Sequence, residues 1–197
     1  MFSGGILACR FGVEEMRVIT GSARGKKLVA PEGLDTRPTG DRVKEGMFSA
    51  AQFMLEGADV LDLYAGSGQL GIEALSRGAA TAVFVDSAKA AQAAINANLK
   101  NCGFTERAVL KPMDAMTYLA GASERFDIAF LDPPYAAEQL EKALPLVSRL
   151  IKQGGVVFCE TAKRVDLPEV AGELKLVKEY RYGRTKVLKY RKGGDEE

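Results

Sequence analysis

The feature that most constrains the fold of this chain is a regular alternation of short apolar runs and helical patterns between Val60 and Cys159. Each apolar run has the length of a strand, and each is followed by a stretch whose apolar residues recur at helical spacing. Apolar strands that alternate with helices are typical of a parallel sheet buried on both faces. The pattern therefore predicts a Rossmann-like α/β fold with a doubly wound, mostly parallel central sheet. The predicted strands are Val60–Tyr64, Ala82–Asp86, Ala108–Leu110, Phe126–Leu131 and Val156–Cys159.

A shorter pattern precedes this alternation. Val18–Thr20 and Lys27–Val29 flank a glycine-containing turn, which predicts a small N-terminal β-hairpin appendage over residues 16–36. Residues 1–15 lack the charged opening region of a signal peptide, and we expect them to be a flexible extension.

The C-terminal part also departs from the alternation. Leu174–Tyr182 and Lys186–Arg191 are predicted as two antiparallel strands joined by a short turn. The acidic tail over residues 193–197 is expected to be disordered. Because no long linker interrupts the chain, residues 16–192 are predicted to form a single domain.

A glycine-rich loop follows the first predicted strand of the alternation. Gly66-Ser67-Gly68-Gln69-Leu70-Gly71 matches the dinucleotide-binding fingerprint, and Asp86 ends the next strand, where a carboxylate can bind ribose hydroxyls. On this motif alone an NAD site is an open alternative, because the fold suits any adenosine-bearing cofactor.

Two further acids favour a different cofactor. Asp62 lies inside the first strand, and Asp114 follows the third strand, where it can accept from an adenine amino group. Acids there disfavour a pyrophosphate but suit a ligand with an ammonium and a sulfonium, so the predicted cofactor is S-adenosylmethionine. Each acid taken singly could instead cap a helix or form a turn, above all Asp114.

The fourth predicted strand ends in Asp132-Pro133-Pro134-Tyr135. Proline lacks a backbone N–H and fixes φ, so this segment is rigid and rich in hydrogen-bond acceptors, and Tyr135 adds a stacking surface. Such a slot suits a planar base with an exocyclic amine, which must be single-stranded or flipped out of a duplex. The alternative is a strand end followed by a simple turn.

Composition removes several other kinds of site. The chain has no histidine and three scattered cysteines, so we expect no metal and read the thiols as reduced, as in a cytoplasmic protein. Cysteine attack on a pyrimidine carbon is a rival methylation chemistry, but Cys102 and Cys159 have no activating neighbour and read as structural. No apolar run is long enough to cross a membrane.

Two segments are strongly basic although the net charge is only +1. The hairpin carries Arg24, Lys26 and Lys27, and the C-terminal strands with Arg184 in their turn hold eight basic residues against one acid. These surfaces could face RNA phosphates, or the lysines could simply prevent exposed edge strands from pairing with other chains.

Arg37 and Arg42 bracket the entry of the helix that follows the hairpin, which Thr39 or Asp41 can cap. At that position the two arginines could meet a phosphate, or pair with nearby carboxylates.

Four motifs together resemble the RsmD family, bacterial methyltransferases that modify N2 of one guanine in small-subunit ribosomal RNA. The likeness runs from about Met16 to Lys192, and Asp86 departs from the glutamate that these proteins often carry. The motifs are Arg-Pro-Thr-x-Asp-Arg-Val at 37–43, Asp-Leu-Tyr-Ala-Gly-Ser-Gly at 62–68, Glu-Ala-Leu-Ser-Arg-Gly-Ala at 73–79 and Leu-Asp-Pro-Pro-Tyr at 131–135.

The resemblance implies a class I methyltransferase fold and assigns roles to the motif residues. Asp132, Pro133, Pro134 and Tyr135 would hold the target base. The implied cofactor residues are Asp62, Tyr64, Ala65, Gly66, Ser67, Gly68, Asp86, Ser87, Asp114 and Ala115. The implied partner is ribosomal RNA or the small ribosomal subunit.

The leading hypothesis is therefore guanine-N2 methylation, and three alternatives stay open. The slot also suits adenine-N6 methylation on DNA or RNA. The chain could bind cofactor and RNA without turnover, or it could be a dehydrogenase.

Overall fold

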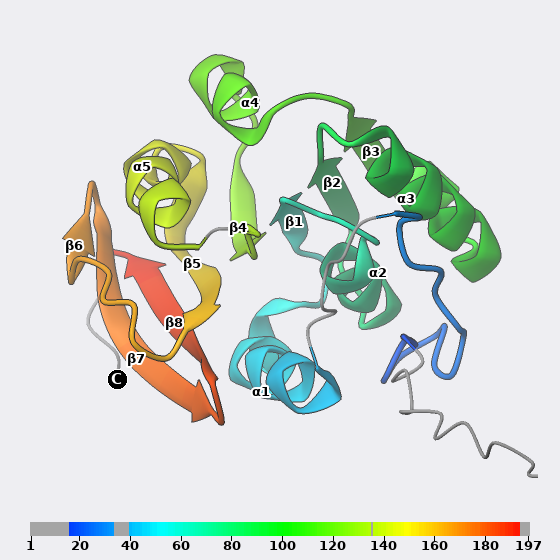
Figure 1. The fold of residues 1–197 in the computed structure, drawn as a ribbon, viewed down its shortest axis with the longest axis horizontal. Coiled ribbons are helices and arrows are strands. Elements are labelled where there is room, and N and C mark those ends of the chain that lie inside the picture. Colours follow the sequence, from blue (N-terminus) through cyan, green and yellow to red (C-terminus); the bar gives the residue numbers. More distant parts are fainter. Residues whose placement is uncertain (1–15, 34–39, 135, 194–197) are drawn as a thin grey trace, which may run out of the picture.

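A computed structural model describes residues 16–33, 40–134 and 136–193 of the chain. Its centre is an eight-stranded sheet in the order β3-β2-β1-β4-β5-β8-β7-β6 (Figure 1). The first five strands of this order run parallel, and β8 and β7 continue the sheet as antiparallel neighbours. The predicted α/β fold with antiparallel C-terminal strands is confirmed.

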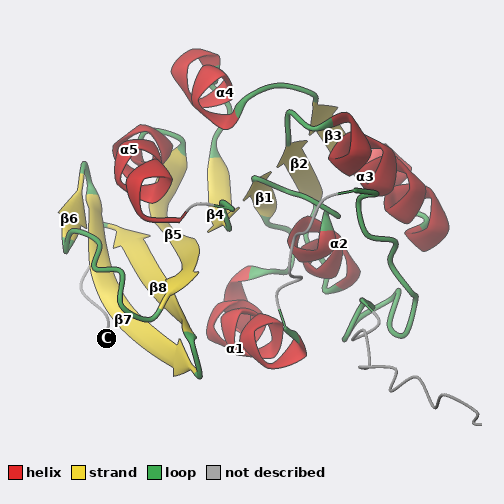
Figure 2. Cartoon of the chain, in the orientation of Figure 1, coloured by secondary structure: helices red, strands yellow, loops and turns green. Residues whose placement is uncertain are grey.

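The elements follow one another in strict alternation over the middle of the chain (Figure 2). Two 3₁₀ turns cover Gln52–Met54 and Thr105–Arg107. The helices are α1 (Asp41–Ala51), α2 (Gln69–Ser76), α3 (Lys89–Cys102), α4 (Ala115–Gly121) and α5 (Ala136–Ser148). The strands are β1 (Asp59–Leu63), β2 (Thr81–Val85), β3 (Ala108–Lys111), β4 (Phe126–Leu131), β5 (Ile151–Ala162), β6 (Val170–Ala171), β7 (Leu174–Tyr182) and β8 (Thr185–Lys192).

Helices cover both faces of the sheet, which creates two apolar cores. One core joins α1, α2 and α3 to one face, and the other joins α4 and α5 to the opposite face (Figure 1). Phe130 of β4 is fully buried in the first core, where its ring packs against Phe48 and Phe158 with centroids 5.1 and 5.7 Å away. Full burial of such a side chain contributes about 1.5–3 kcal/mol, so β4 is held firmly up to the residue before Asp132.

The N-terminal segment, residues 16–33, forms no regular strand. Its two arms pair through a single bridge between Arg17 and Lys27, supported by the hydrogen bonds Val18 N–H to Lys26 O (2.9 Å) and Leu28 N–H to Met16 O (2.8 Å). The arms therefore approach each other as the hairpin prediction expects, but the ladder is too short to make strands. Residues 1–15 and 194–197 lie outside the described residues.

The entry to α1 differs from the cap that the sequence suggested. Gly40 holds the N-cap position without a side-chain hydrogen bond, and Asp41 is the first helical residue. Asp41 instead accepts from Arg17 at 3.3 Å, because the N-terminal segment packs beside this end of α1. Thr39 lies outside the described residues.

Candidate functional site

The acids singled out in the sequence converge at the carboxyl edge of the parallel sheet. β1 lies between β2 and β4, so Tyr64, Asp86 and Asp132, which directly follow these three strands, come out at one edge. Open α/β sheets bind their ligands in this place. The topology thus brings together side chains that lie up to about seventy residues apart in the sequence.

Asp62 is the buried member of this group. It lies inside β1, is 2% exposed, and accepts a hydrogen bond from the Gly71 N–H of α2 at 2.8 Å. Burial raises the pKa of the Asp62 carboxyl well above its ordinary range, and the nearby carboxylates of Asp132 and Asp86 raise it further against the effect of the Gly71 N–H. A negative charge at Asp62 would therefore be stabilised by a cation bound at this edge.

The glycine loop turns sharply between β1 and α2. Tyr64 has φ of +65°, the one positive value at a non-glycine residue among those described, and Gly66 and Gly68 have φ of +55° and +75°. Positive φ strains a bulky side chain and persists where the surroundings enforce it, as at binding sites. Gly71 is required for another reason, since a Cβ there would lie 2.3 Å from the ring of Phe84.

Asp86 ties the glycine loop to the end of β2. One carboxylate oxygen accepts from Gly66 N–H at 2.8 Å and the other accepts from Ala88 N–H at 2.9 Å, while Ser87 lies exposed between them. Each carboxylate oxygen has a further acceptor position. Asp86 is half-buried and is thus placed both to hold the loop and to accept from a hydroxyl.

Asp114 acts as the N-cap of α4, where its carboxylate accepts from Thr117 N–H at 2.9 Å and the buried Ala115 follows it. The capping alternative is confirmed for this residue, although its side chain is still exposed at the edge. The hydroxyl of Tyr64 is buried and has no hydrogen-bond partner among the described residues. Burial, together with the Asp114 carboxylate, raises the pKa of Tyr64 to about 12.

The Asp-Pro-Pro segment continues β4 at the same edge. Asp132 is half-buried, Pro133 is buried and Pro134 is exposed. Pro133 and Pro134 carry no N–H and have a fixed φ, so the segment offers carbonyl acceptors on a rigid backbone with few donors of its own. Tyr135, the predicted stacking platform, lies outside the described residues.

Asn98 of α3 is a site residue that the sequence analysis missed. It is 1% exposed, and its amide donates to Ser67 O at 2.9 Å and to Val29 O at 3.0 Å, while its carbonyl accepts from Val29 N–H at 2.8 Å. One side chain thus connects the glycine loop to the N-terminal segment. A polar residue on the apolar stripe of a helix was the available signal, since Ala91, Ile95 and Cys102 share this face.

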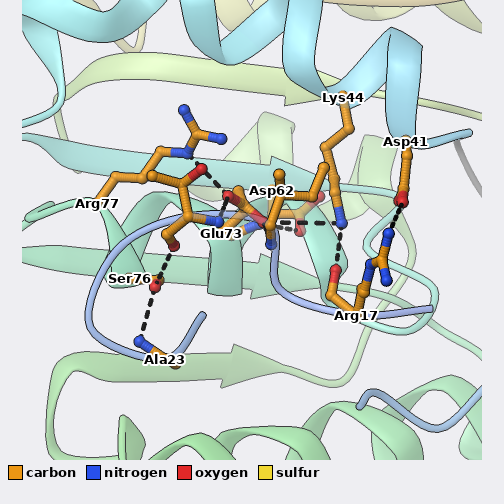
Figure 3. Close-up of polar contacts among 11 residues, drawn as sticks. Arg17, Ala23, Asp41, Lys44, Asp62, Glu73, Ser76 and Arg77 are labelled. Atoms are coloured by element: carbon orange, nitrogen blue, oxygen red, sulfur yellow. Dashed lines mark hydrogen bonds and ion pairs between the residues drawn. The ribbon is translucent and has the colours of Figure 1, made fainter. Parts of the chain in front are cut away.

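A second buried polar cluster anchors the N-terminal segment further along α2. Glu73 accepts from Ile19 N–H (2.8 Å), Thr20 N–H (3.0 Å) and Arg77 Nε (2.8 Å), with the Lys44 ammonium 3.7 Å away. Figure 3 shows Lys44 and Arg77 approaching Glu73 from different sides. Lys44 and Glu73 are both fully buried, and burial lowers the pKa of Lys44 despite the Glu73 carboxylate.

The basic residues of the N-terminal segment lie away from the acids. Ala23 N–H donates to Ser76 Oγ at 3.0 Å at the last residue of α2, and Lys26 Nζ donates to Asn101 O near the end of α3. α2 and α3 run from the carboxyl edge to the opposite edge, so Arg24, Lys26 and Lys27 lie by the amino ends of the strands. The contact of Arg24, Lys26 and Lys27 with RNA stays a prediction.

The C-terminal basic residues divide into two groups. Lys186 is buried and bonded to Glu179 (3.1 Å) and Asp166 (3.2 Å), and Lys192 is buried against Ser148 O and Glu173. Arg184 is exposed in the β7–β8 turn.

Arg42 is exposed in the first turn of α1, one turn before Gly46. A Cβ at Gly46 would lie 1.7 Å from the Tyr182 hydroxyl at the end of β7, and Ala50 O accepts from Lys189 Nζ further back along β8. The start of α1 therefore lies at the carboxyl edge. Arg37 lies outside the described residues.

Cys102 and Cys159 are buried, and burial raises the pKa of each thiol, which fits structural residues; Cys9 lies outside the described residues. Within residues 16–33, 40–134 and 136–193, no three acidic, histidine or cysteine side chains gather as a metal site. No helix in that part of the chain combines the length and apolarity needed to cross a membrane.

Comparison with known proteins agrees with the fold and the motifs. The family model described as "Conserved hypothetical protein 95" matches residues 16–191. The protein YlbH of Bacillus subtilis (strain 168) is 41% identical over 184 residues, 91% of this chain and 100% of that protein. The ribosomal RNA small subunit methyltransferase D of Escherichia coli (strain K12) is 33% identical over 170 residues, 85% of each chain. The chain belongs to the RsmD family.

The resemblance to the RsmD family drawn from the motifs is thus confirmed. The solved structure of the Escherichia coli protein yhhF matches with a TM-score of 0.81 at 33% identity, covering 90% of this chain and 98% of that one. The fold is the class I methyltransferase fold. The RsmD motif at 73–79 gains a physical reason from the structure, because its Glu73 and Ser76 hold residues 19–23.

Proposed function

We propose that this chain is an S-adenosylmethionine-dependent methyltransferase that acts on the exocyclic N2 of a guanine in small-subunit ribosomal RNA. The observation that carries the proposal is the convergence of Asp62, Asp86 and Asp132 around a strained glycine loop at one sheet edge. The guanine and its N2 are taken from the RsmD resemblance, and the ribosomal substrate is supported by the name of the Escherichia coli relative.

The residues at the edge fit this cofactor. The Tyr64 hydroxyl is buried without a hydrogen-bond partner in the described part of the chain, Gly66 has open space where a side chain would stand, and the Asp86 carboxylate retains acceptor capacity. Asp86 with Ser87 would hold the ribose hydroxyls, Asp114 with Ala115 the adenine, and Asp62 with Tyr64 to Gly68 the methionine part. When bound, the cofactor supplies an electrophilic methyl group on a sulfonium.

Asp132 and Pro133 would position the target amine. Their oxygens accept from the N–H bonds of the exocyclic amine, which turns its lone pair toward the methyl group, and stacking on Tyr135 fixes the plane of the base. The chain supplies orientation and charge complementarity rather than a covalent intermediate. The base must leave its stack to enter the slot.

RNA binding is assigned to the exposed basic residues. Arg42 at the start of α1 and Arg184 in the β7–β8 turn lie at the carboxyl edge, next to the slot, and Arg37 precedes the same helix. Arg24, Lys26 and Lys27 lie at the opposite edge and would contact RNA beyond the target base. The net charge of the chain, +1, offers no general attraction, so local clusters carry the affinity.

A methyl-transfer assay tests the proposal. Purified protein is incubated with labelled S-adenosylmethionine and with ribosomal RNA, or assembled small subunits, from cells that lack the modification. We expect label in the RNA, and mass spectrometry of the nucleosides should identify N2-methylguanosine. N6-methyladenosine in its place would reject the guanine assignment.

The Asp132→Ala variant tests the mechanism. We expect it to lose transfer by several orders of magnitude while calorimetry shows that cofactor affinity survives, because Asp132 is assigned to the base. Full activity of Asp132→Ala would reject the slot, and Glu169→Ala, an exposed acid on the β5–β6 connection, serves as the control.

A further inference from the structure

A basic groove lies beside the proposed base slot and combines Arg184 with Lys163 and Arg164, which have no part in the proposed function. It has a volume of about 740 Å³ and lies between the residues that follow β5 and the turn that joins β7 to β8. Its lining consists of Ala162, Lys163, Arg164, Gly183 and Arg184.

The two walls of the groove are fixed to each other. Lys163 N–H donates to Arg184 O at 2.9 Å, and Val165 N–H donates to Ala162 O at 2.9 Å, which closes the turn after β5. At the last residue of β5, Ala162 pairs with Thr185, which is the end of the β5–β8 ladder. The three cationic side chains therefore extend from a rigid frame, which lowers the entropic cost of binding an anion.

The charge of this groove is positive and available. Lys163, Arg164 and Arg184 are exposed, and no ion pair between described residues involves any of them. The nearby acids are already engaged, since Asp166 and Glu179 pair with Lys186, and Glu179 also pairs with Arg181.

Register places the groove at the edge where the base slot lies. Leu131 of β4 is paired in parallel with Cys159 of β5, and β5 continues to Ala162. At about 3.3 Å per residue the groove starts about 10 Å beyond the end of β4, on the adjoining strand. Figure 1 shows β5, β8 and β7 side by side in this part of the sheet.

We propose that Lys163, Arg164 and Arg184 form a phosphate-binding site for the backbone of the RNA strand that carries the target base. The inference rests on the proposed function and adds to it the place where the strand flanking the flipped base is held. Arginine matches the geometry of phosphate oxygens with paired donors, and lysine adds a compact charge. Arg42 at the start of α1 extends the same positive edge.

The test is a triple variant, Lys163→Gln, Arg164→Gln and Arg184→Gln. Its affinity is measured for naked small-subunit ribosomal RNA and for assembled small subunits over a series of salt concentrations. We expect affinity for naked RNA to fall roughly tenfold or more, and the slope of log affinity against log salt to shrink by about two, since each lost phosphate contact accounts for about 0.7. Cofactor affinity should stay unchanged.

The control is Arg125→Gln, Lys175→Gln and Lys178→Gln, which removes the same charge from exposed residues. Arg125 precedes β4 and Lys175 is the second residue of β7, so both lie at the opposite edge, and Lys178 lies midway along β7. An equal loss in the two triple variants, or none in the groove variant, would overturn the proposal.

Two further outcomes distinguish an RNA partner from a protein partner, and the groove proposal from the proposed function. Loss of affinity for assembled subunits with unchanged affinity for naked RNA would assign the groove to an acidic protein surface and reject the RNA proposal. If the wild type transfers no methyl group to any RNA but the groove variant still weakens RNA binding, the groove is supported and the proposed function fails.

Discussion

The N-terminal segment and the C-terminal β7–β8 hairpin are alike in sequence and opposite in construction. Both are short, basic and predicted as antiparallel pairs. Residues 16–33 have one bridge between their arms and are held by buried side chains of α1, α2 and α3. The β7–β8 pair has a long ladder and extends the central sheet through β5.

This difference decides what each region can do. The N-terminal segment satisfies buried polar groups of the helices with its own backbone. Its loss would take the N–H groups of Ile19 and Thr20 from Glu73, and both hydrogen bonds to Val29 from Asn98. The hairpin holds itself through its ladder, so its turn is free to carry exposed charge at the carboxyl edge. We therefore expect the first region to act mainly in stability, and the end of the second region to carry more of the proposed contact with RNA.

The largest effect is expected from Glu73→Ala. Removing this carboxylate leaves Lys44 buried without its anion and frees the backbone N–H groups of Ile19 and Thr20, so the free energy of unfolding should fall by about 3–5 kcal/mol. Urea unfolding measures this. The counterpart in the hairpin, Glu179→Ala, should cost clearly less, because the Glu179 side chain is 25% exposed and the buried Lys186 keeps Asp166 as its anion. Equal losses would show that the two regions are built alike.

Asn98→Leu should have the next largest effect. It leaves Ser67 O and both polar groups of Val29 unpaired, and we expect a loss of about 1–3 kcal/mol in stability. Cofactor affinity should fall as well, because the glycine loop loses its support. Asn101→Leu on the same helix removes one exposed hydrogen bond to Lys27 O and is the matched control. Unchanged cofactor affinity in Asn98→Leu would show that the link between the N-terminal segment and the glycine loop does not support cofactor binding.

Asp62 should make both stability and cofactor affinity depend on pH. Its folded pKa is raised above the unfolded value of about 3.9, so its ionisation costs stability progressively as pH rises from there through the raised pKa. Asp62→Asn should therefore be the more stable protein at neutral pH, and the difference should vanish toward acid pH in thermal unfolding.

Burial favours the protonated form of Asp62, whereas a bound cation favours its ionised form. Cofactor affinity of the wild type should rise with pH through the raised pKa of Asp62 and then level off, with about a tenfold change for each unit of pKa shift. Calorimetry of Asp62→Asn should show a flatter profile. Identical profiles would place the cation away from Asp62.

The smallest effect is expected from neutralising Arg24, Lys26 and Lys27 together. They lie at the edge opposite to the slot, so RNA affinity should fall only about two- to threefold, and much less than for the groove variant. Filter binding over a salt series measures both. A loss as large as that of the groove variant would give the two basic regions equal parts in RNA binding, whereas no change would remove the N-terminal segment from the RNA surface.

Much of the fold and of the candidate site was predictable because the signals are local. The apolar runs gave the parallel strands, and Leu174–Tyr182 is the observed β7. The glycine loop and the acids at strand ends were found from spacing alone. The burial of Lys44, Glu73 and Asn98 was not found, because their partners lie far along the chain; the apolar stripe of α3 was a local signal for Asn98.

The sequence by itself determined the order of elements, the acids at the strand ends and the family, since these depend on periodicity and on short motifs. The tertiary structure alone decided which charges are buried and which face outward. Lys186 and Arg184 are two residues apart, yet the ladder of β8 with β5 buries the first among its ion pairs, whereas the second lies exposed in the turn before β8 begins. Only the packed sheet reveals that difference, because charge alone does not record the direction in which a side chain points.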